Sequence, residues 1–299
     1  MNWFIYHIAS GHAFFTGIAL IMIAVRAGSG SSGFGKRVAT WSLLLGALAV
    51  ASSSTPLPGW VYVLATIVTM FWIVSLLIGK RLRWAAWAVL GVWAFAAAIE
   101  LPYHFLPGLP VASSRSIAVI GDSISAGMGD SDRSVKWPEV LAADHGLRVH
   151  DLSYPGATAA SAWKLARTQR ITCPIVILQI GGNDLLGGNS PTQFAQDLDM
   201  LLASVRAAER QLVMFELPLP PGMHQYGRIQ RRLARKHDVR LIPKRVLMGI
   251  LTAKHATVDT IHLTPLGHQR MAACVWQIIR PAFPPVPTAG FETEPEANG

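Results

Sequence analysis

Hydrophobic and polar positions divide the chain into two parts with different patterns. Four long apolar runs come first, at Trp3–Val25, Val38–Thr55, Trp60–Ile78 and Trp84–Leu101. None of them contains Lys, Arg or Asp, and their only Glu, Glu100, lies at the end of the fourth run. Each run has ~18 or more residues, enough for an α-helix to cross a bilayer. We therefore predict a domain of four transmembrane helices over residues 1–101.

Beyond residue 114, short β-rich runs alternate with stretches of helical spacing. The predicted strands are Ser116–Ile120, Arg148–Ser153, Ile175–Ile180, Leu212–Leu217 and Val239–Ile242. Helical stretches separate them, and a last helix follows Thr264. This alternation is typical of a parallel sheet with helices on both faces. We predict an α/β domain over residues 115–281, a Pro- and Ser-rich linker over 102–114 and a disordered tail over 282–299.

The charged residues follow the same division. They make up 14% of the chain, against about 25% in an ordinary soluble domain. Only six of the 26 basic and one of the 17 acidic residues lie before residue 102. Since the later part is nearly balanced, the net charge of +9 does not indicate a nucleic-acid-binding protein.

The basic residues of the apolar part lie in two of its connecting loops. Between the first and second runs are Arg26, Lys36 and Arg37, and between the third and fourth are Lys80, Arg81 and Arg83. Basic loops remain in the cytoplasm. We therefore predict a multi-pass protein of the cell inner membrane. Its N-terminus and its α/β domain would then face the periplasm or the outside.

Three short motifs lie where an open parallel sheet binds ligands, beyond the carboxyl ends of its strands, and a fourth lies just before the last helix. Gly121-Asp122-Ser123 follows the first predicted strand, SYPGAT (153–158) the second and GGND (181–184) the third, while DTIHLTP (259–265) precedes the last helix. Each motif alone is common in turns. Their joint placement indicates one site.

These motifs hold the groups that acyl transfer requires. Ser123 has the hydroxyl of a nucleophile, and His262 is the candidate base because imidazole takes up protons near neutral pH. Asp259 lies three residues earlier, where a carboxylate can fix the imidazole tautomer. Donors to a tetrahedral intermediate would be the backbone N–H groups of Ser123 and Gly156 and the side-chain amide of Asn183.

The set Gly121-Asp122-Ser123, Gly156, Gly181-x-Asn183-Asp184 and Asp259-x-x-His262 resembles the SGNH (GDSL-type) hydrolase family, in that family's order, over residues 115–281. The resemblance implies a flavodoxin-like three-layer α/β/α sandwich with Ser123 as nucleophile. It also implies an oxyanion hole of Ser123, Gly156 and Asn183, and His262 as a base partnered by Asp259. Ile124 replaces the Leu of the name-giving motif, and the second block is a variant. The resemblance does not extend to residues 1–112.

We therefore expect a membrane-anchored serine esterase that hydrolyses carboxylic esters through an acyl-serine intermediate. Its substrate would be an ester of a lipid or an acylated glycan, and neither a metal, an organic cofactor nor a nucleic acid is expected. An envelope polysaccharide O-acyltransferase or deacetylase is one alternative, because the same acyl-serine can react with a sugar. A non-catalytic scaffold of an envelope complex is the other, and an envelope protein partner stays open.

Several polar residues lie outside this constellation. His7, His12, Glu100 and His104 fall within or near the apolar runs, where we favour interfacial or packing roles over a transport relay. The basic run Arg228–Arg245 predicts a solvated helix face, with contact to anionic lipid headgroups as the alternative.

Five further side chains concern the α/β domain. Asp122 and Asp184 are interpreted as structural carboxylates, and His268 as a residue at the surface or behind the site. Cys173 and Cys274 are interpreted as two thiols, although a compartment outside the cytoplasm would permit a disulfide.

Overall fold

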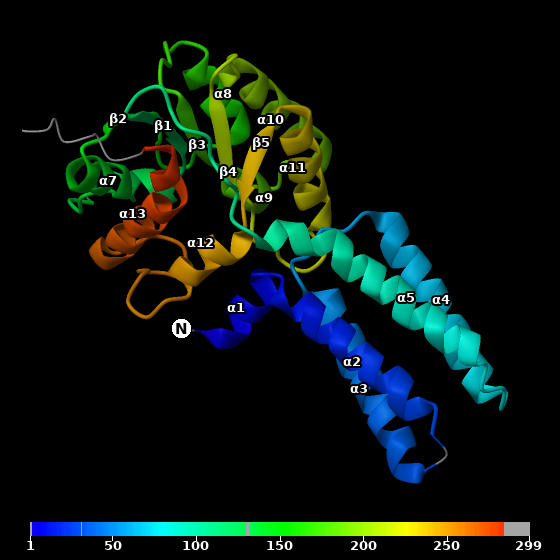
Figure 1. Cartoon of the computed structure of the whole chain (residues 1–299). Coiled ribbons are helices and arrows are strands. Elements are labelled where there is room, and N and C mark those ends of the chain that lie inside the picture. The colour runs from blue at the N-terminus through cyan, green and yellow to red at the C-terminus, as the bar shows by residue number, and fades with distance from the viewer. Residues whose placement is uncertain (1, 31, 130–131, 284–299) are drawn as a thin grey trace, which may run out of the picture.

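The computed structural model describes residues 2–30, 32–129 and 132–283 (Figure 1). An α/β domain holds a sheet between two layers of helices, and two helical hairpins project from one end of it. The hairpins pair α2 (His12–Gly28) with α3 (Gly33–Ser52) and α4 (Gly59–Leu77) with α5 (Arg83–Glu100). Residues 284–299 of the predicted tail lie outside the described residues.

Five parallel strands form the sheet in the order β2-β1-β3-β4-β5. They are β1 (Ser116–Gly121), β2 (Arg148–Asp151), β3 (Ile175–Gln179), β4 (Gln211–Phe215) and β5 (Val239–Ile242). Every residue of β1, β3 and β4 is buried, as expected of parallel strands covered on both faces. The order is that of flavodoxin-like doubly wound sheets. The predicted parallel α/β fold is therefore confirmed.

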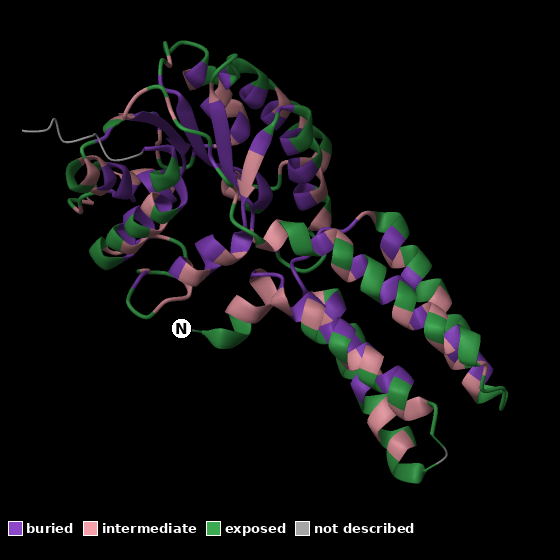
Figure 2. Ribbon diagram, viewed as in Figure 1, coloured by how far each residue is buried: buried purple, intermediate pink, exposed green. Residues whose placement is uncertain are grey.

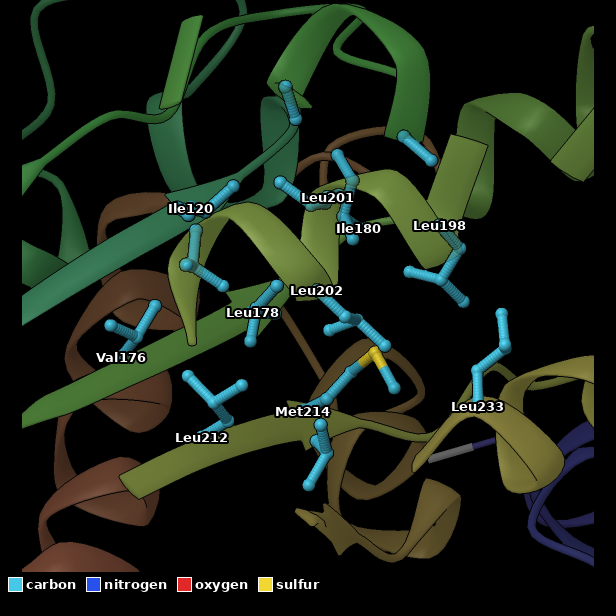
Figure 3. Close-up of a cluster of buried hydrophobic side chains, with 14 of the residues drawn as sticks. Ile120, Val176, Leu178, Ile180, Leu198, Leu201, Leu202, Leu212, Met214 and Leu233 are labelled. Atoms are coloured by element: carbon cyan, nitrogen blue, oxygen red, sulfur yellow. The ribbon is translucent and has the colours of Figure 1, made fainter. Parts of the chain in front are cut away.

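Successive residues of the central strands face opposite helical layers. Ala118, Ile120, Val176 and Leu178 pack against α8 (Ala159–Ala166), α10 (Pro191–Val205) and α11 (His224–Lys236), as Figure 3 shows for much of this cluster. Their neighbours Ile117, Val119, Ile175 and Ile177 pack against α7 (Trp137–His145), α12 (Lys244–Leu251) and α13 (Pro265–Ile279). The period of two along each strand therefore produces two cores.

The helical stretches expected between the strands form α7, α8, α10, α11 and α13. Sequence analysis did not anticipate α12, nor the short helices α6 (Ser123–Ala126) and α9 (Gly182–Leu186). The two cysteines, Cys173 and Cys274, are free thiols.

The helical hairpins expose large apolar side chains to their surroundings. On α3, α4 and α5 these include Trp41, Leu48, Val63, Ile67, Leu77, Trp84 and Trp87, each at least 58% exposed (Figure 2). Three helices are long and apolar enough to cross a membrane, namely Gly33–Ser52, Gly59–Leu77 and Arg83–His104, the last of which includes the short helix η1 (Leu101–His104). Such surfaces are typical of helices in contact with lipid.

The first apolar run does not form the single span predicted over Trp3–Val25. It is broken into α1 (Trp3–Ala9) and α2, whose axes differ by 85°. Gly11 lies at the break with a φ of +87°, a left-handed conformation that glycine adopts readily. The bend lets α1 turn aside under α12, where the Asn2 N–H donates to the Thr252 carbonyl at 3.2 Å. A fourth span exists only if the bent pair is counted as one.

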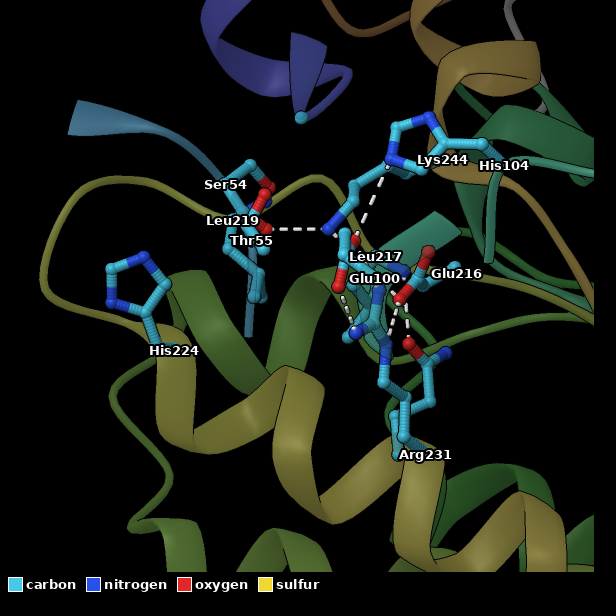
Figure 4. A network of polar contacts seen from close by, with 12 residues as sticks. Ser54, Thr55, Glu100, His104, Glu216, Leu217, Leu219, His224, Arg231 and Lys244 are labelled. Atoms are coloured by element: carbon cyan, nitrogen blue, oxygen red, sulfur yellow. Dashed lines mark hydrogen bonds and ion pairs between the residues drawn. The ribbon is translucent and has the colours of Figure 1, made fainter. Parts of the chain in front are cut away.

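The hairpins and the α/β domain meet through buried polar contacts (Figure 4). The segment Ser53–Pro58, between α3 and α4, lies against the loop that follows β4. Ser54 accepts hydrogen bonds at both of its oxygens, from the Leu219 N–H (2.7 Å, to Oγ) and from Nζ of Lys244 (to the carbonyl). Glu100, at the end of α5, is fully buried against Arg231 of α11. The carboxyl ends of β4 and β5 therefore face the hairpins.

Candidate active site

Ser123 lies at a sharp turn from strand to helix. β1 ends at Gly121, and Ser123 is the first residue of α6 and is partly exposed. A Cβ on Gly121 would come within 2.4 Å of Oγ of Ser125, so only glycine fits there. The Asp122 side chain caps the helix by accepting from the Ile124 N–H at 3.0 Å. The nucleophile candidate is thus held at the carboxyl edge of the sheet.

Asp122 is a buried capping carboxylate, as predicted. Burial raises its pKa to about 6, while the bond from the Ile124 N–H and the charge of His262 act in the opposite direction. No hydrogen bond joins Ser123 to His262 among the described residues.

The second and third motifs lie side by side. Gly156 adopts a φ of +75°, and the space where its Cβ would stand is open. The amide of Asn183 donates from Nδ2 to the Ala157 carbonyl at 3.0 Å, which orients the side chain toward the Gly156 loop. An amide nitrogen carries two protons, so one remains for a substrate oxygen. Gly156 and Asn183 can therefore supply donors to one point.

Asp184 braces these two motifs from within the core. Its fully buried carboxylate accepts from the Ala159 N–H at 2.9 Å and from Nδ2 of Asn189 at 3.1 Å. Burial raises its pKa, and these two hydrogen bonds oppose the effect. Asp184 thus connects the start of α8 to α9, the short helix that also carries Asn183. This agrees with the predicted structural role of Asp184.

His262 and Asp259 form a close pair on the loop before α13. Nδ1 of His262 lies 2.7 Å from Oδ2 of Asp259, and the His262 N–H donates to Oδ1 at 2.9 Å. Thr260 between them has a φ of +82°, a conformation uncommon for a side-chain-bearing residue. This turn brings the carboxylate back to the imidazole. Hydrogen bonds from His262 hold the pKa of Asp259 at about 2, so the carboxylate stays ionised at neutral pH.

A buried chain of side chains behind α6 was missed by sequence reasoning. Trp137 donates from Nε1 to Oγ of Ser125 at 3.1 Å, and Ser125 donates to Oε1 of Gln179 at 3.1 Å. The Trp137 N–H donates to Nδ1 of His268 at 3.2 Å. His268 is fully buried, so of its two predicted positions, at the surface or behind the site, the structure agrees with the second, and burial lowers its pKa to about 4. The only sign of this chain in the sequence is Ser125, which lies close to the Gly121-Asp122-Ser123 motif.

Comparisons with known proteins agree with this geometry. The model of the GDSL-like Lipase/Acylhydrolase family matches residues 119–270. Esterase TesA of Pseudomonas aeruginosa is 29% identical over 189 residues, which cover 57% of this chain and 90% of that protein. Thioesterase 1/protease 1/lysophospholipase L1 of Escherichia coli K12 is 31% identical over 158 residues, covering 48% of this chain and 74% of that protein.

A solved structure shows the same fold. The psychrotrophic esterase EstA from Pseudoalteromonas superposes with a TM-score of 0.50 at 16% identity, over 56% of this chain and 98% of that one. The family match begins within β1 and ends within α13, so it spans the whole sheet. The chain therefore belongs to the GDSL-like lipase/acylhydrolase family, and its α/β domain is a serine hydrolase acting on ester bonds.

Proposed function

We propose that the protein is a membrane-anchored esterase that works on the side of the membrane away from the cytoplasm, with Ser123 as nucleophile. The proposal is supported by the hydrogen-bonded Asp259–His262 pair, together with the positions of Ser123 and Asn183 just beyond the carboxyl ends of the paired strands β1 and β3. A serine, a base with its own carboxylate and oriented donors are what acyl transfer needs.

In the proposed reaction His262 takes the hydroxyl proton of Ser123 as Oγ attacks the ester carbonyl. The oxyanion receives hydrogen bonds from the N–H groups of Ser123 and Gly156 and from the amide of Asn183. His262 then gives the proton to the departing alcohol, which leaves an acyl-serine. Water, activated by the same imidazole, releases the acid and restores Ser123. Asp259 stabilises the imidazolium in both halves.

Membrane anchoring is supported by the distribution of charge along the hairpins. Lys36, in the first turn of α3, and Lys80, in the loop between α4 and α5, belong to the ends of the hairpins far from the α/β domain (Figure 1). Under the positive-inside rule those ends are cytoplasmic, which places the enzyme on the opposite side. Backbones of α2 and α3 approach closely at Gly17 and Gly46, as small residues permit between membrane helices. In this arrangement α3, α4 and α5 span the bilayer, and the bent pair of α1 and α2 provides the fourth crossing.

The surroundings of the site favour an apolar acyl ester over a glycan. Segments in or next to the catalytic motifs expose large apolar side chains, namely Met128, Leu186, Val258 and Ile261. This edge of the sheet is also the one from which the hairpins depart. Apolar side chains gathered around a site indicate an apolar partner. We therefore favour a lipid ester drawn from the membrane.

A fluorophosphonate probe tests the nucleophile. The full-length protein should be labelled, Ser123→Ala should not, and Ser204→Ala, a change at an exposed serine of α10, should be labelled like the wild type. Labelling of Ser123→Ala would refute the assignment. Absence of labelling and of ester hydrolysis in the wild type would favour a scaffold.

Reporter fusions and product analysis test the rest of the proposal. Alkaline phosphatase should be active when fused after residue 299 and inactive when fused at Gly79, in the loop between α4 and α5. The reverse pattern would place the enzyme in the cytoplasm. When a glycan acceptor is present, release of free acid indicates hydrolysis, whereas an acylated glycan indicates acyl transfer.

A further inference from the structure

A cleft separate from the catalytic edge lies between α11 and the nearby ends of α4 and α5. Its volume is ≈ 450 Å³. One wall is a face of α11 with four arginines, and the opposite wall consists of Pro56, Pro58, Ile99 and Tyr103. No carboxylate and none of the proposed catalytic residues lines it among the described residues. The cleft thus combines one strongly basic wall with one apolar wall.

The arginines of the cleft differ in the ion-pair and hydrogen-bond partners that they have. Arg231 is buried and paired with Glu100 and Glu216 at 2.6 Å each. Arg235 donates to the hydroxyl of Tyr103 at 2.9 Å, a neutral partner. Arg228 and Arg232 form no ion pair or side-chain hydrogen bond with any residue in the described ranges.

Helix geometry places the uncompensated charges together. Positions 228, 232 and 235 are separated by four and three residues, so they share one face of α11. Three positive charges therefore face the cleft without a carboxylate to balance them. Such a wall favours an anionic ligand, and guanidinium groups match the oxygens of phosphate in particular.

The depth of the cleft is set by the helices that border it. Pro58 immediately precedes α4, and Trp60 in the first turn of that helix is 58% exposed, as in an interfacial aromatic belt. Tyr103 lies about 20 residues after Arg83, the start of α5, which corresponds to roughly 30 Å of helix and to the thickness of the hydrocarbon core. The cleft is therefore at the level of lipid headgroups.

We propose that this cleft binds the headgroup of an anionic phospholipid in the leaflet that faces the enzyme. Arg228, Arg232 and Arg235 contact the phosphate, and the apolar wall at Pro58 and Ile99 contacts the glycerol and the start of the acyl chains. The proposal rests on the membrane anchoring proposed above and does not depend on the esterase chemistry. The bound lipid is a structural ligand distinct from the ester that Ser123 attacks.

Thermal denaturation of the full-length protein in dodecyl maltoside tests the site. The midpoint is measured against rising concentrations of dihexanoyl phosphatidylglycerol, of dihexanoyl phosphatidylcholine and of inorganic phosphate. Phosphatidylglycerol should stabilise the wild type at lower concentration than either of the others. In Arg228→Gln/Arg232→Gln the half-saturating concentration should rise about 30-fold, the effect expected from two basic side chains near a lipid surface.

A matched control removes the same charge elsewhere. Arg170 and Arg206 are exposed and lie where α8 and α10 lead back to β3 and β4, at the sheet edge opposite the hairpins. Arg170→Gln/Arg206→Gln should respond like the wild type. The proposal is overturned if both double variants respond alike, or if phosphatidylcholine acts as strongly as phosphatidylglycerol. An equal response to inorganic phosphate would assign the cleft to a soluble anion instead.

Hydrolysis of p-nitrophenyl acetate, measured on the same samples, keeps the two proposals apart. Arg228→Gln/Arg232→Gln should hydrolyse this soluble ester at the wild-type rate, and Ser123→Ala should keep the response to phosphatidylglycerol. Hydrolysis without a lipid response would contradict only the proposed headgroup site. A lipid response without hydrolysis would contradict only the proposed esterase mechanism.

Discussion

Arg231 holds Glu100 by two parallel hydrogen bonds, Nη1 to Oε2 at 2.6 Å and Nη2 to Oε1 at 2.8 Å. The same guanidinium reaches Glu216 from Nε at 2.6 Å, and Lys244 lies 3.9 Å from that second carboxylate. One cation of the hydrolase therefore joins the last apolar helix to the loop after β4. All four side chains are buried, so each charge depends on its partners.

Arg231→Met should destabilise the full-length protein by about 3–5 kcal/mol, because it leaves two buried carboxylates with too few cations. Glu100→Gln should be milder, since Arg231 keeps Glu216. The thermal midpoint in detergent measures both. As a control, Lys236→Met breaks a largely exposed pair with Asp199 and should cost less than about 1 kcal/mol. Equal losses for Arg231→Met and Lys236→Met would contradict this account.

Asn183→Ala should lower kcat for a p-nitrophenyl ester by about 10²–10³, with a smaller change in KM, because an oxyanion donor acts mainly in the transition state. Asn189→Ala is the matched control. Its amide contacts Asp184 and does not belong to the proposed site, so stability should fall while kcat stays close to the wild-type value. A similar loss of kcat in both variants would assign Asn183 a structural role.

Asp259→Ala should lower kcat on the order of 10³-fold and move the acid limb of the pH–rate profile to lower pH. The pKa of Asp259 is about 2, so its negative charge is present throughout the assay range. Removing that charge makes protonation of His262 less favourable. Asp144→Ala, at an exposed carboxylate of α7, should leave the profile in place. An acid limb that stays in place in Asp259→Ala would contradict the proposed pairing of Asp259 with His262.

Asp122→Asn should change how stability depends on pH. The pKa of Asp122 is raised by burial to about 6 in the folded protein, above the ordinary value near 3.9 of the unfolded chain. Its contribution is therefore fully present below about pH 4 and is lost as the pH rises through about 6, a decline of ~3 kcal/mol. The variant lacks this ionisation, so its stability relative to the wild type should increase over that interval. Parallel stability curves from pH 4 to 7 would be evidence against a buried ionisation.

Gly17→Ala should destabilise the pairing of α2 and α3 by about 1–3 kcal/mol, as overpacking does elsewhere. A Cβ at that position would lie 2.7 Å from the Gly46 carbonyl oxygen. Gly91 of α5 faces open space, so Gly91→Ala introduces the same methyl group without a clash. Thermal midpoints of the two variants in detergent should differ accordingly, and matching midpoints would rule out close packing at Gly17.

The sheet and the positions of the four motifs were predictable because both depend on local patterns. Val239–Ile242 matches β5 in full, and the other predicted strands end within two residues of the observed ones. The pairing of Asp259 with His262 also follows from their spacing of three residues on one loop. Such features need no knowledge of how distant segments pack.

Other features depend on contacts between distant parts of the chain. The bend at Gly11 places α1 against α12, and apolar periodicity alone cannot distinguish this from a continuous span. Arg231 lies within a basic run that suggested a solvated face, yet Glu100, 131 residues away, makes it a buried residue. For His268 the sequence left open a position at the surface or behind the site, because nothing nearby in the chain indicates its contact with Trp137.

The segment Ser53–Pro58 also links the hydrolase domain to the helical hairpins by contacts other than the covalent chain. It is seated in the α/β domain through Ser54, while Glu100 holds Arg231 and the His104 carbonyl accepts from Nε of Arg245 at 3.0 Å. A protease that cuts at the exposed Phe105 or Leu106 would sever the covalent connection but leave these contacts in place. Under the proposed membrane anchoring, a single cleavage there would therefore leave the hydrolase domain attached to its helices.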